Sequence, residues 1–206
     1  MTNPIWIWQY DQWPQFCWND SSLIGPLARV REKQGRLVGM MDALGFENQS
    51  ASSLDTFTED VLRNAEIEGL ILNEEHVRSS VARHLGIDLA SATATDHYSE
   101  GVVQVLMDAV ENASEPLTEQ RLFNWHAALF PTGRSGMTPI TVGAYRSGDE
   151  PMLVVSGAMG KEKIHYEAPP SDRVADEMRL FLQWLNAEST IDPLLKAGIA
   201  HLWFIN

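Results

Sequence analysis

The chain has 206 residues, of which 44% are hydrophobic and 21% charged, enough apolar side chains for one large domain or two small ones. Its formal net charge of −13 argues against a nucleic-acid partner, because an acidic surface repels phosphate backbones. The single cysteine, Cys17, cannot form an internal disulfide, and no apolar stretch approaches the roughly 20 residues of a membrane-spanning helix. The first residues also lack the pattern of a signal peptide, so we expect a soluble, cytoplasmic protein without a membrane partner.

Aromatic residues crowd the start of the chain. Four of the seven tryptophans lie within residues 1–19, namely Trp6, Trp8, Trp13 and Trp18. So many rings need to be covered, since exposed aromatic patches are rare on monomeric proteins. We favour a terminal segment that buries its rings on a helical body, and a partner-binding surface is the alternative.

Helical periodicity dominates the next part of the chain. Ser21 or Ser22 is expected to cap a helix that runs to about Leu44, with Gly45 just beyond its end. Ser53 is expected to cap the helix that follows. Three more helices are predicted at about 74–85, 96–112 and 118–129. After residue 170 the pattern returns twice, with Ser171 and Asp192 as the expected caps.

A stretch rich in glycine and proline interrupts the helices between residues 132 and 170. Two strand-like runs in it, Met152–Ser156 and Lys161–Glu167, flank the sequence Gly-Ala-Met-Gly and predict a β-hairpin. An exposed strand edge can pair with an extended peptide, so the hairpin is either a docking element or a structural arm. The residues alone favour neither.

The last predicted helix carries apolar residues to its end and runs directly into Phe204-Ile205-Asn206. No capping residue, glycine or polar tail follows it. Since a native C-terminus is commonly polar and frayed, we expect the chain to be truncated.

Common catalytic motifs do not occur in the sequence. It has no phosphate-binding loop, no dinucleotide-binding glycine pattern and no paired histidines at helical spacing, so no metal site is expected. His126 and His201 lie on apolar helices and are expected to be core or boundary residues. In the segment from Asn64 to Gly69, the carboxylate of Glu68 directly precedes a glycine, where a ligand or another backbone can come close. A solvated helix end is the simpler interpretation of the composition.

Taken together, these features resemble Fic proteins, which transfer AMP from ATP to hydroxyl groups of target proteins. The start, Trp6-Ile7-Trp8-Gln9, resembles the N-terminal extension of one bacterial branch of that family. The segment around Glu68 resembles the inhibitory helix of the same branch, in which a Ser or Thr is followed four residues later by Glu and then by Gly or Asn. Glu68 and Gly69 match this pattern, and Asn64 stands at the Ser/Thr position.

Later segments resemble the Fic core. Residues 122–129 with His126 resemble its first helix, Val142–Arg146 the turn after it, and Ile164-His165-Tyr166 the exit of the target-docking flap. The helix Pro193–Phe204 resembles the one that leads into the catalytic loop, H-P-F-x-D/E-G-N-G-R. That loop would carry the catalytic and metal-binding residues. It is absent from the sequence, so neither role is assigned to any residue.

The resemblance implies a mostly α fold, a Fic-like helical bundle with an inserted β-hairpin whose C-terminal part is missing. It implies an N-terminal helical extension at residues 1–112, with the inhibitory helix at about 53–71. An incomplete core with the flap hairpin at 152–167 would follow at 113–206.

The implied function is the transfer of AMP from ATP, with Mg²⁺, to a Ser, Thr or Tyr hydroxyl of a target protein bound through the flap. Glu68, flanked by Asn64 and Gly69, would inhibit the transfer by pairing with a loop arginine that otherwise grips the γ-phosphate. This chain by itself is expected to be inactive and to bind neither ATP nor Mg²⁺. A second copy of the chain, forming a homodimer, is a further expected partner.

Other functions stay open. An acidic helical module could bind partners through its aromatic start and its hairpin without catalysis, or the inhibitory helix could act in trans on another Fic enzyme. A small-molecule enzyme that uses His126 or Glu66 is the least favoured, because no acid and base pair at helical spacing.

Overall fold

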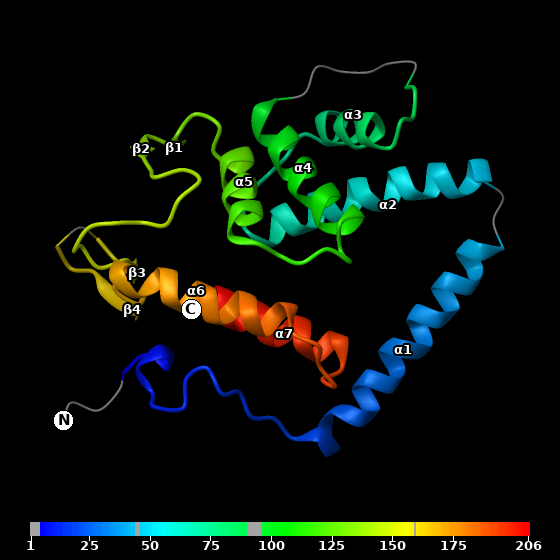
Figure 1. The fold of residues 1–206 in the computed structure, drawn as a ribbon. Helices are drawn as coiled ribbons and strands as arrows, with labels where there is room; N and C mark the ends of the chain where they lie inside the picture. Colours follow the sequence, from blue (N-terminus) through cyan, green and yellow to red (C-terminus); the bar gives the residue numbers. More distant parts are fainter. Residues whose placement is uncertain (1–4, 44–45, 90–95, 159) are drawn as a thin grey trace. The chain divides into compact units, whose positions relative to one another are not determined.

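A computed structural model of the chain describes residues 5–43, 46–89, 96–158 and 160–206 (Figure 1). It confirms a mostly helical fold with small antiparallel β-hairpins. The described elements are η1 (Ile7–Gln9), α1 (Asp20–Asp42), α2 (Phe46–Ile67), α3 (Glu74–His84), α4 (His97–Glu111), α5 (Glu119–Leu129), β1 (Arg134–Ser135), β2 (Thr138–Pro139), β3 (Leu153–Ser156), β4 (Lys163–Glu167), α6 (Ser171–Asn186) and α7 (Pro193–Phe204). Among the described residues, no helix combines the length and apolar character needed to cross a membrane.

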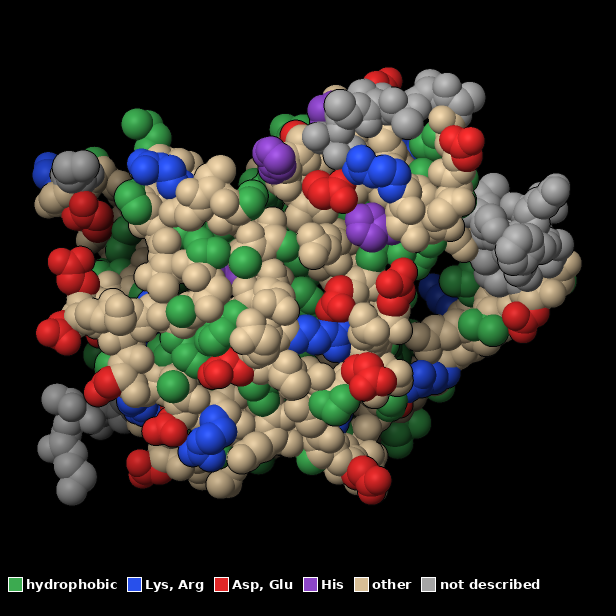
Figure 2. Space-filling model, turned by 45° about the horizontal axis from the view of Figure 1, so that its top comes forward, with side chains coloured by type: hydrophobic (Ala, Val, Ile, Leu, Met, Phe, Trp, Pro, Cys, Tyr) green, Lys and Arg blue, Asp and Glu red, His purple; other side chains and the backbone are tan. Residues whose placement is uncertain are grey.

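The chain forms two compact units. Unit 1 comprises Met1–Leu27, Leu117–Glu119 and Ala144–Asn206, and unit 2 comprises Ala28–Pro116 and Gln120–Gly143. Each unit therefore contains segments from both sides of residue 112, where the resemblance places a domain boundary. On the face shown in Figure 2, acidic side chains are spread over the surface rather than gathered in one patch.

Unit 2 has an aliphatic core between α2, α3 and α4, which lie side by side in Figure 1. Its buried residues recur at helical spacing, so each helix turns one apolar stripe inward. They are Leu54, Val61, Val77, Val81, Ala82, Val103 and Met107. The close packing continues to α5, because a Cβ on Gly101 of α4 would lie only 2.1 Å from the carbonyl oxygen of Ala128. Only glycine leaves room for the α5 backbone there.

The helix ends in unit 2 follow the sequence signals closely. Asn73 and Asp96 cap α3 and α4 by accepting backbone N–H groups, and Gly69 and Gly86 adopt positive φ just past α2 and α3. The helices predicted at 74–85 and 96–112 are confirmed within a residue or two. Glycine fits these helix ends because it enters the left-handed region without steric cost.

Three predicted caps are wrong. Ser53 lies inside α2, which begins at Phe46, since no glycine or proline interrupts the stretch before it. Helix α1 begins at Asp20, ahead of Ser21 and Ser22, and Asn19 receives the N–H of Ser22 instead. Ser171 is the first residue of α6, and its hydroxyl donates to the carbonyl of Gly148 rather than capping the helix. The cap at Asp192 is confirmed, because its carboxylate accepts the N–H of Leu194.

Helix α1 does not bury the apolar stripe that its periodicity predicts. Val30 is 40% exposed and Leu37 is 61% exposed. The predicted helix end at Leu44 and Gly45 lies outside the described residues. Periodicity alone therefore identified the helix without showing whether its apolar residues are covered.

Unit 1 has an aromatic core on α6 and α7, which contact each other. Phe181 of α6 lies 5.7 Å from Trp203 and 5.8 Å from Phe204, measured between ring centroids. Trp13 and Phe16 from the start of the chain pack on the same Trp203, each at 6.1 Å. The interpretation of the N-terminal aromatics as a segment that covers a helical body is consistent with these contacts.

The hairpin of unit 1 is close to its predicted extent. Leu153 pairs with Glu167 and Val154 with Tyr166, but Val155 pairs with Ile164, so His165 is an extra residue in β4. Such a β-bulge bends the strand and re-aims side chains. Met159, in the predicted loop, lies outside the described residues. The short pair β1–β2 in unit 2 was not predicted, because its strands have two residues each.

Candidate functional site

The hairpin β3–β4 of unit 1 exposes apolar side chains on both of its strands. All four residues of β3 are exposed, and so are the first three residues of β4. Val154 is 54% exposed and Ile164 is 49% exposed. A strand pair of this kind offers both backbone edges and apolar side chains to an extended partner.

The three predicted flap residues have different environments. Ile164 faces solvent. The bulged residue His165 is also exposed, and its Nε2 lies 2.6 Å from the hydroxyl of Ser156 across the hairpin. Tyr166 is half-buried: its hydroxyl donates to the carbonyl of Asn206 at 2.5 Å, and partial burial raises its pKa. Of the three, Tyr166 therefore anchors the hairpin, whereas Ile164 and His165 are available to a partner.

Residues from the start of the chain hold the base of the hairpin. The indole N–H of Trp8 donates to the carbonyl of Glu167 at 2.7 Å. The ring of Trp6 meets that of Tyr166 edge to face at 5.7 Å. These contacts join positions about 160 residues apart in the sequence, and no local sequence pattern predicts them.

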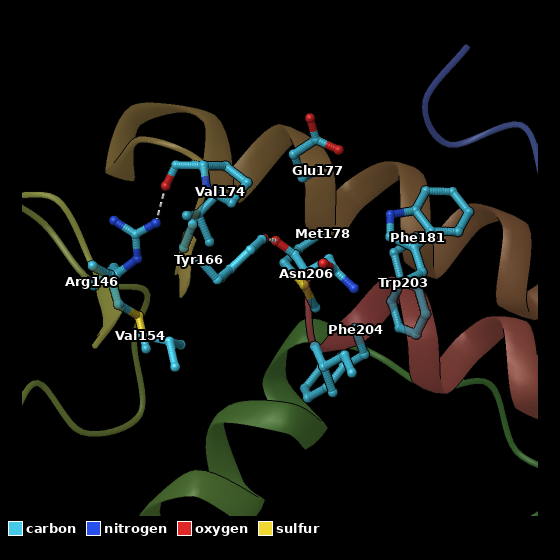
Figure 3. Close-up of a pocket in the computed structure, with 14 residues that line it drawn as sticks. Arg146, Val154, Tyr166, Val174, Glu177, Met178, Phe181, Trp203, Phe204 and Asn206 are labelled. Atoms are coloured by element: carbon cyan, nitrogen blue, oxygen red, sulfur yellow. Dashed lines mark hydrogen bonds between the residues drawn. The ribbon is translucent and has the colours of Figure 1, made fainter. Parts of the chain in front are cut away.

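A cavity of about 250 Å³ lies beside the hairpin in the same unit (Figure 3). Its lining is mainly apolar and includes Met152, Val154, Met178, Phe181, Trp203 and Phe204. Its two charged members already have partners. The guanidinium of Arg146 donates to the carbonyl of Pro169, and the carboxylate of Glu177 accepts the indole N–H of Trp13 at 3.1 Å. The cavity therefore suits an apolar group more than an anion.

The predicted regulatory segment lies in unit 2, at the end of α2. The N–H of Gly69 donates to the carbonyl of Glu66 and that of Leu70 to Ala65, which is the bonding of a helix closed by a left-handed glycine. Asn64 and Glu68 are both exposed, and among the described residues no side chain or backbone group pairs with the carboxylate of Glu68. The neighbouring Glu66, by contrast, forms an ion pair with Arg63 at 2.8 Å.

The predicted core helix and turn also have a local structural role. In unit 2, the ring nitrogen Nδ1 of His126 accepts the N–H of Gly143 at 3.3 Å, and its ring lies 5.0 Å from that of Phe130. Gly143 has a positive φ of 66°. His126 is thus a half-buried residue that fixes a turn, as expected of a boundary histidine.

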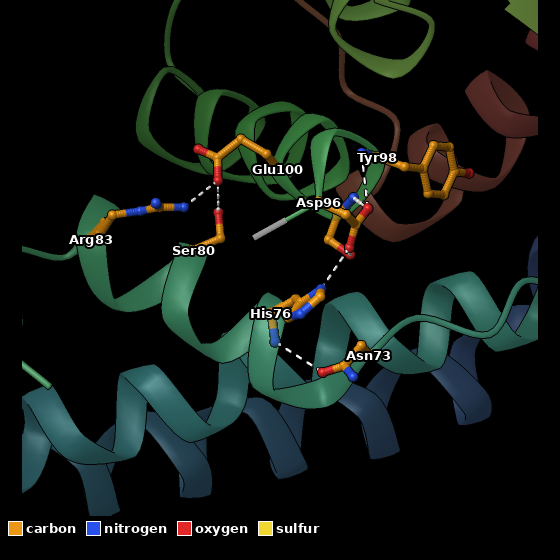
Figure 4. A network of polar contacts seen from close by, with 8 residues as sticks. Asn73, His76, Ser80, Arg83, Asp96, Tyr98 and Glu100 are labelled. Carbon is orange, nitrogen blue, oxygen red and sulfur yellow. Dashed lines mark hydrogen bonds and ion pairs between the residues drawn. The ribbon is translucent and has the colours of Figure 1, made fainter. Parts of the chain in front are cut away.

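A polar network joins α3 to α4 in unit 2 (Figure 4). Asp96 accepts the N–H groups of Tyr98 and Ser99 and contacts His76 Nδ1 at 2.9 Å. Partial burial alone would raise the pKa of Asp96, but the hydrogen bonds from Ser99, His76 and Tyr98 hold it well below its ordinary value.

The same network contains two serines, a histidine and two carboxylates, but not in a catalytic arrangement, and the hydroxyl of Ser99 donates to Asp96 rather than to His76. A serine nucleophile needs its hydroxyl bonded to the base. The buried hydroxyl of Ser80 donates to Glu100 at 2.7 Å, and Arg83 donates to that same carboxylate. The network therefore joins two helices. Among the described residues, no group of three or more His, Cys, Asp or Glu side chains is placed to hold a metal ion.

Sequence reasoning missed the residues that connect distant segments. Trp8 and Trp6 were recognised as aromatics to be covered, but nothing in the sequence named β4 as their partner. The bulge at His165 was also missed, because alternation in a hairpin exposed on both faces sets no register. The cap at Asp96 could have been found from the Asp-His-Tyr-Ser-Glu start of α4, which is typical of an N-terminus.

The fold and the site define a mostly helical protein with an exposed, anchored β-hairpin. Residues 6–87 match a family described as Domain of unknown function (DUF4172). The matched stretch is less than half of the chain, and it contains the aromatic start, Asn64, Glu68 and Gly69. No curated protein matches the chain.

Proposed function

We propose that the chain is the N-terminal and partial core region of a protein adenylyltransferase of the Fic type, which modifies a Ser, Thr or Tyr hydroxyl of a target protein. The observation that carries the proposal is the hairpin β3–β4, an exposed strand pair in a helical protein, at the place where the Fic resemblance expects a docking flap. The resemblance supplies the reaction, and the exposure of the hairpin supports the docking role.

Docking would rely on the backbone of the hairpin. An extended target segment adds to a free strand edge through main-chain hydrogen bonds, and its side chains rest on exposed apolar residues such as Val154 and Ile164. Held in this way, a target hydroxyl meets the reacting centre in one orientation, which lowers the entropic part of the barrier.

Glu68 would restrain the transfer. Its carboxylate is exposed at the end of α2 and unpaired among the described residues, so it is available to an arginine from outside them. A charge-assisted carboxylate–guanidinium pair is among the stronger hydrogen-bonded contacts in proteins. Such a pair would withhold the arginine from ATP. Asn64 lies one turn earlier, and Gly69 ends the helix so that the carboxylate stands at its tip.

The proposal places no site for ATP or Mg²⁺ on the residues of this chain. The catalytic loop motif does not occur in the sequence, and the described residues offer no cluster of metal ligands. We therefore assign no chemical step to a residue of this chain. Its proposed contributions are target docking and restraint.

The test is AMP incorporation by the complete gene product, measured with ATP labelled at the α-phosphate. Glu68→Ala should increase incorporation at least tenfold, because the restraint is removed. Glu66→Ala is the matched control, since Glu66 lies two residues away and pairs with Arg63; it should leave incorporation unchanged. Equal incorporation by the parent and both variants would reject the regulatory role of Glu68, and no incorporation by any of them would reject the transferase.

A second candidate is an interaction module without catalysis. It is favoured by the exposed apolar surface of α1, where Val30 and Leu37 face solvent, together with that of the hairpin. Partner binding that persists without nucleotide, in a protein that incorporates no AMP, would select this function instead.

A further inference from the structure

The two edges of the hairpin β3–β4 are not equivalent. The N–H of Ala168 donates to the carbonyl of Met152 at 2.9 Å, so these two residues form a hydrogen-bonded pair. In an antiparallel ladder the next pair, Leu153 and Glu167, must direct its backbone groups away from the partner strand. Both residues thus present their N–H and C=O groups at the outer edges of the hairpin.

The outer edge of β4 is occupied at this position. The indole N–H of Trp8 donates to the outward carbonyl of Glu167 at 2.7 Å, and the ring of Trp6 covers the neighbouring Tyr166. On β3, by contrast, the outward backbone groups of Leu153 have no hydrogen-bond partner in the part of the chain that the structure describes. One edge of the hairpin is closed by the N-terminal segment, and the other is open.

The residue that closes the edge is itself firmly held. Trp8 is only 9% exposed, and the guanidinium of Arg173 lies 5.3 Å from the centre of its ring. Arg173 pairs in turn with Glu177 at 2.6 Å, and Glu177 accepts the indole N–H of Trp13. Trp8 and Trp13 are thus connected through two residues of α6. Trp8 contacts Arg173 by a cation–π interaction, Arg173 forms an ion pair with Glu177, and Glu177 accepts a hydrogen bond from Trp13.

We propose that residues 5–16 act as a latch that fixes the hairpin at β4 and leaves β3 as the docking edge, with Trp8 and Trp6 as its positioning residues. This inference rests on the proposed docking function and adds to it the strand that a target segment joins. A two-stranded hairpin is marginally stable in water, so an anchor is needed if the hairpin is to present one orientation. A hairpin has two outer strand edges that can pair with an extended chain, and closing one of them leaves a single edge for pairing.

The test is amide hydrogen exchange on this chain, with Trp8→Phe as the main variant. Phenylalanine keeps an aromatic ring and removes the indole N–H. Trp18→Phe is the matched control, because the Trp18 indole donates only to the nearby Asp20 at 2.8 Å. Trp6→Ala is the second variant and removes the contact with Tyr166.

We expect exchange in β3 and β4 to become roughly 3- to 10-fold faster in Trp8→Phe and in Trp6→Ala, as the loss of one modest contact should give. Exchange in α6 and α7 should stay as in the parent, and Trp18→Phe should change neither region. In the parent, the indole proton of Trp8 should exchange more slowly than that of Trp18.

Unchanged exchange in β3 and β4 of both variants would overturn the latch. Equal acceleration in α6 and α7 would also overturn it, since the segment would then be a general stabiliser of the unit. The exchange measurement needs neither ATP nor a target. Failure of the latch is therefore distinguishable from failure of the proposed transferase, which AMP incorporation tests.

Discussion

Each of the two units has a core of a different kind. Unit 2 packs small aliphatic side chains such as Val61, Val77 and Val103 from helices that are neighbours in the sequence. Unit 1 packs large rings and connects the start of the chain to its last 60 residues through indole N–H groups and ring contacts. The difference teaches where sequence reasoning succeeds: a local, periodic core can be read from the sequence, and a core assembled from distant segments cannot.

The two units also differ in how each presents its proposed functional element. Unit 2 places Glu68 at the end of a helix that Gly69 closes, so its carboxylate is presented by simple helix geometry. Unit 1 presents a hairpin that would be marginal alone and depends on anchors from far away in the sequence. Substitutions far away in the sequence are therefore expected to disturb the structure of the hairpin β3–β4 more than that of the helix end at Glu68.

The largest expected effect lies in the aromatic core of unit 1. Phe181→Ala should lower the free energy of unfolding of unit 1 by about 4 kcal/mol, because a buried ring is lost and a cavity remains. Leu180→Ala changes the adjacent residue, which is 41% exposed, and should cost less than about 1 kcal/mol. Urea unfolding followed by tryptophan fluorescence measures both. Similar costs for the two variants would show that the rings do not form a core.

The close approach of α4 and α5 gives the next largest effect, in unit 2. Gly101→Ala should cost about 3 kcal/mol, since its Cβ would meet the Ala128 carbonyl oxygen at 2.1 Å and that atom belongs to backbone. Gly39→Ala, on α1, meets no atom within 4 Å and should stabilise the protein by up to about 1 kcal/mol through helix propensity. Thermal unfolding midpoints compare the two glycines. If Gly101→Ala were as harmless as Gly39→Ala, the packing of α4 on α5 would be wrong.

The smallest expected effect is the pH dependence that Asp96 gives to unit 2. Its pKa is lower in the folded than in the unfolded protein, so its stabilising contribution is complete above the unfolded value of about 4 and is lost as the pH falls below it. Asp96→Ala should lower the free energy of unfolding by about 1 kcal/mol at pH 7, as the loss of an N-cap does. This difference in unfolding free energy between the variant and the parent should shrink towards pH 3.

Asp60→Ala, on the exposed face of α2, is the control for Asp96 and should change stability little at either pH. Urea unfolding at pH 7 and at pH 3 measures the differences. A deficit of Asp96→Ala that grew on acidification would contradict the depressed pKa.

Much of the fold could be predicted, for reasons that particular residues show. The cap at Asp192 and the hairpin strands follow from local chemistry, and they were found. The cap at Asp96 follows from the same chemistry, but only its helix was predicted. The exposure of Leu37 could not be foreseen, because periodicity marks an apolar face without showing whether anything covers it. The candidate site was predicted only in part. Glu68 and Ile164 were selected through the resemblance to Fic proteins, and their roles stay predictions. The anchoring of Tyr166 depends on Trp6 and Asn206, which no local pattern connects.

We propose above all that an extended target segment docks along β3 for AMP transfer. The most direct test compares Leu153→Pro with Leu153→Ala in the complete gene product carrying Glu68→Ala. The outward N–H of Leu153 makes no bond within the hairpin, so proline should remove it while the hairpin persists, which hydrogen exchange can verify. We predict that Leu153→Pro lowers incorporation of labelled AMP into target protein at least tenfold and that Leu153→Ala largely retains it. Full incorporation by Leu153→Pro, with the hairpin intact, would contradict docking at this edge.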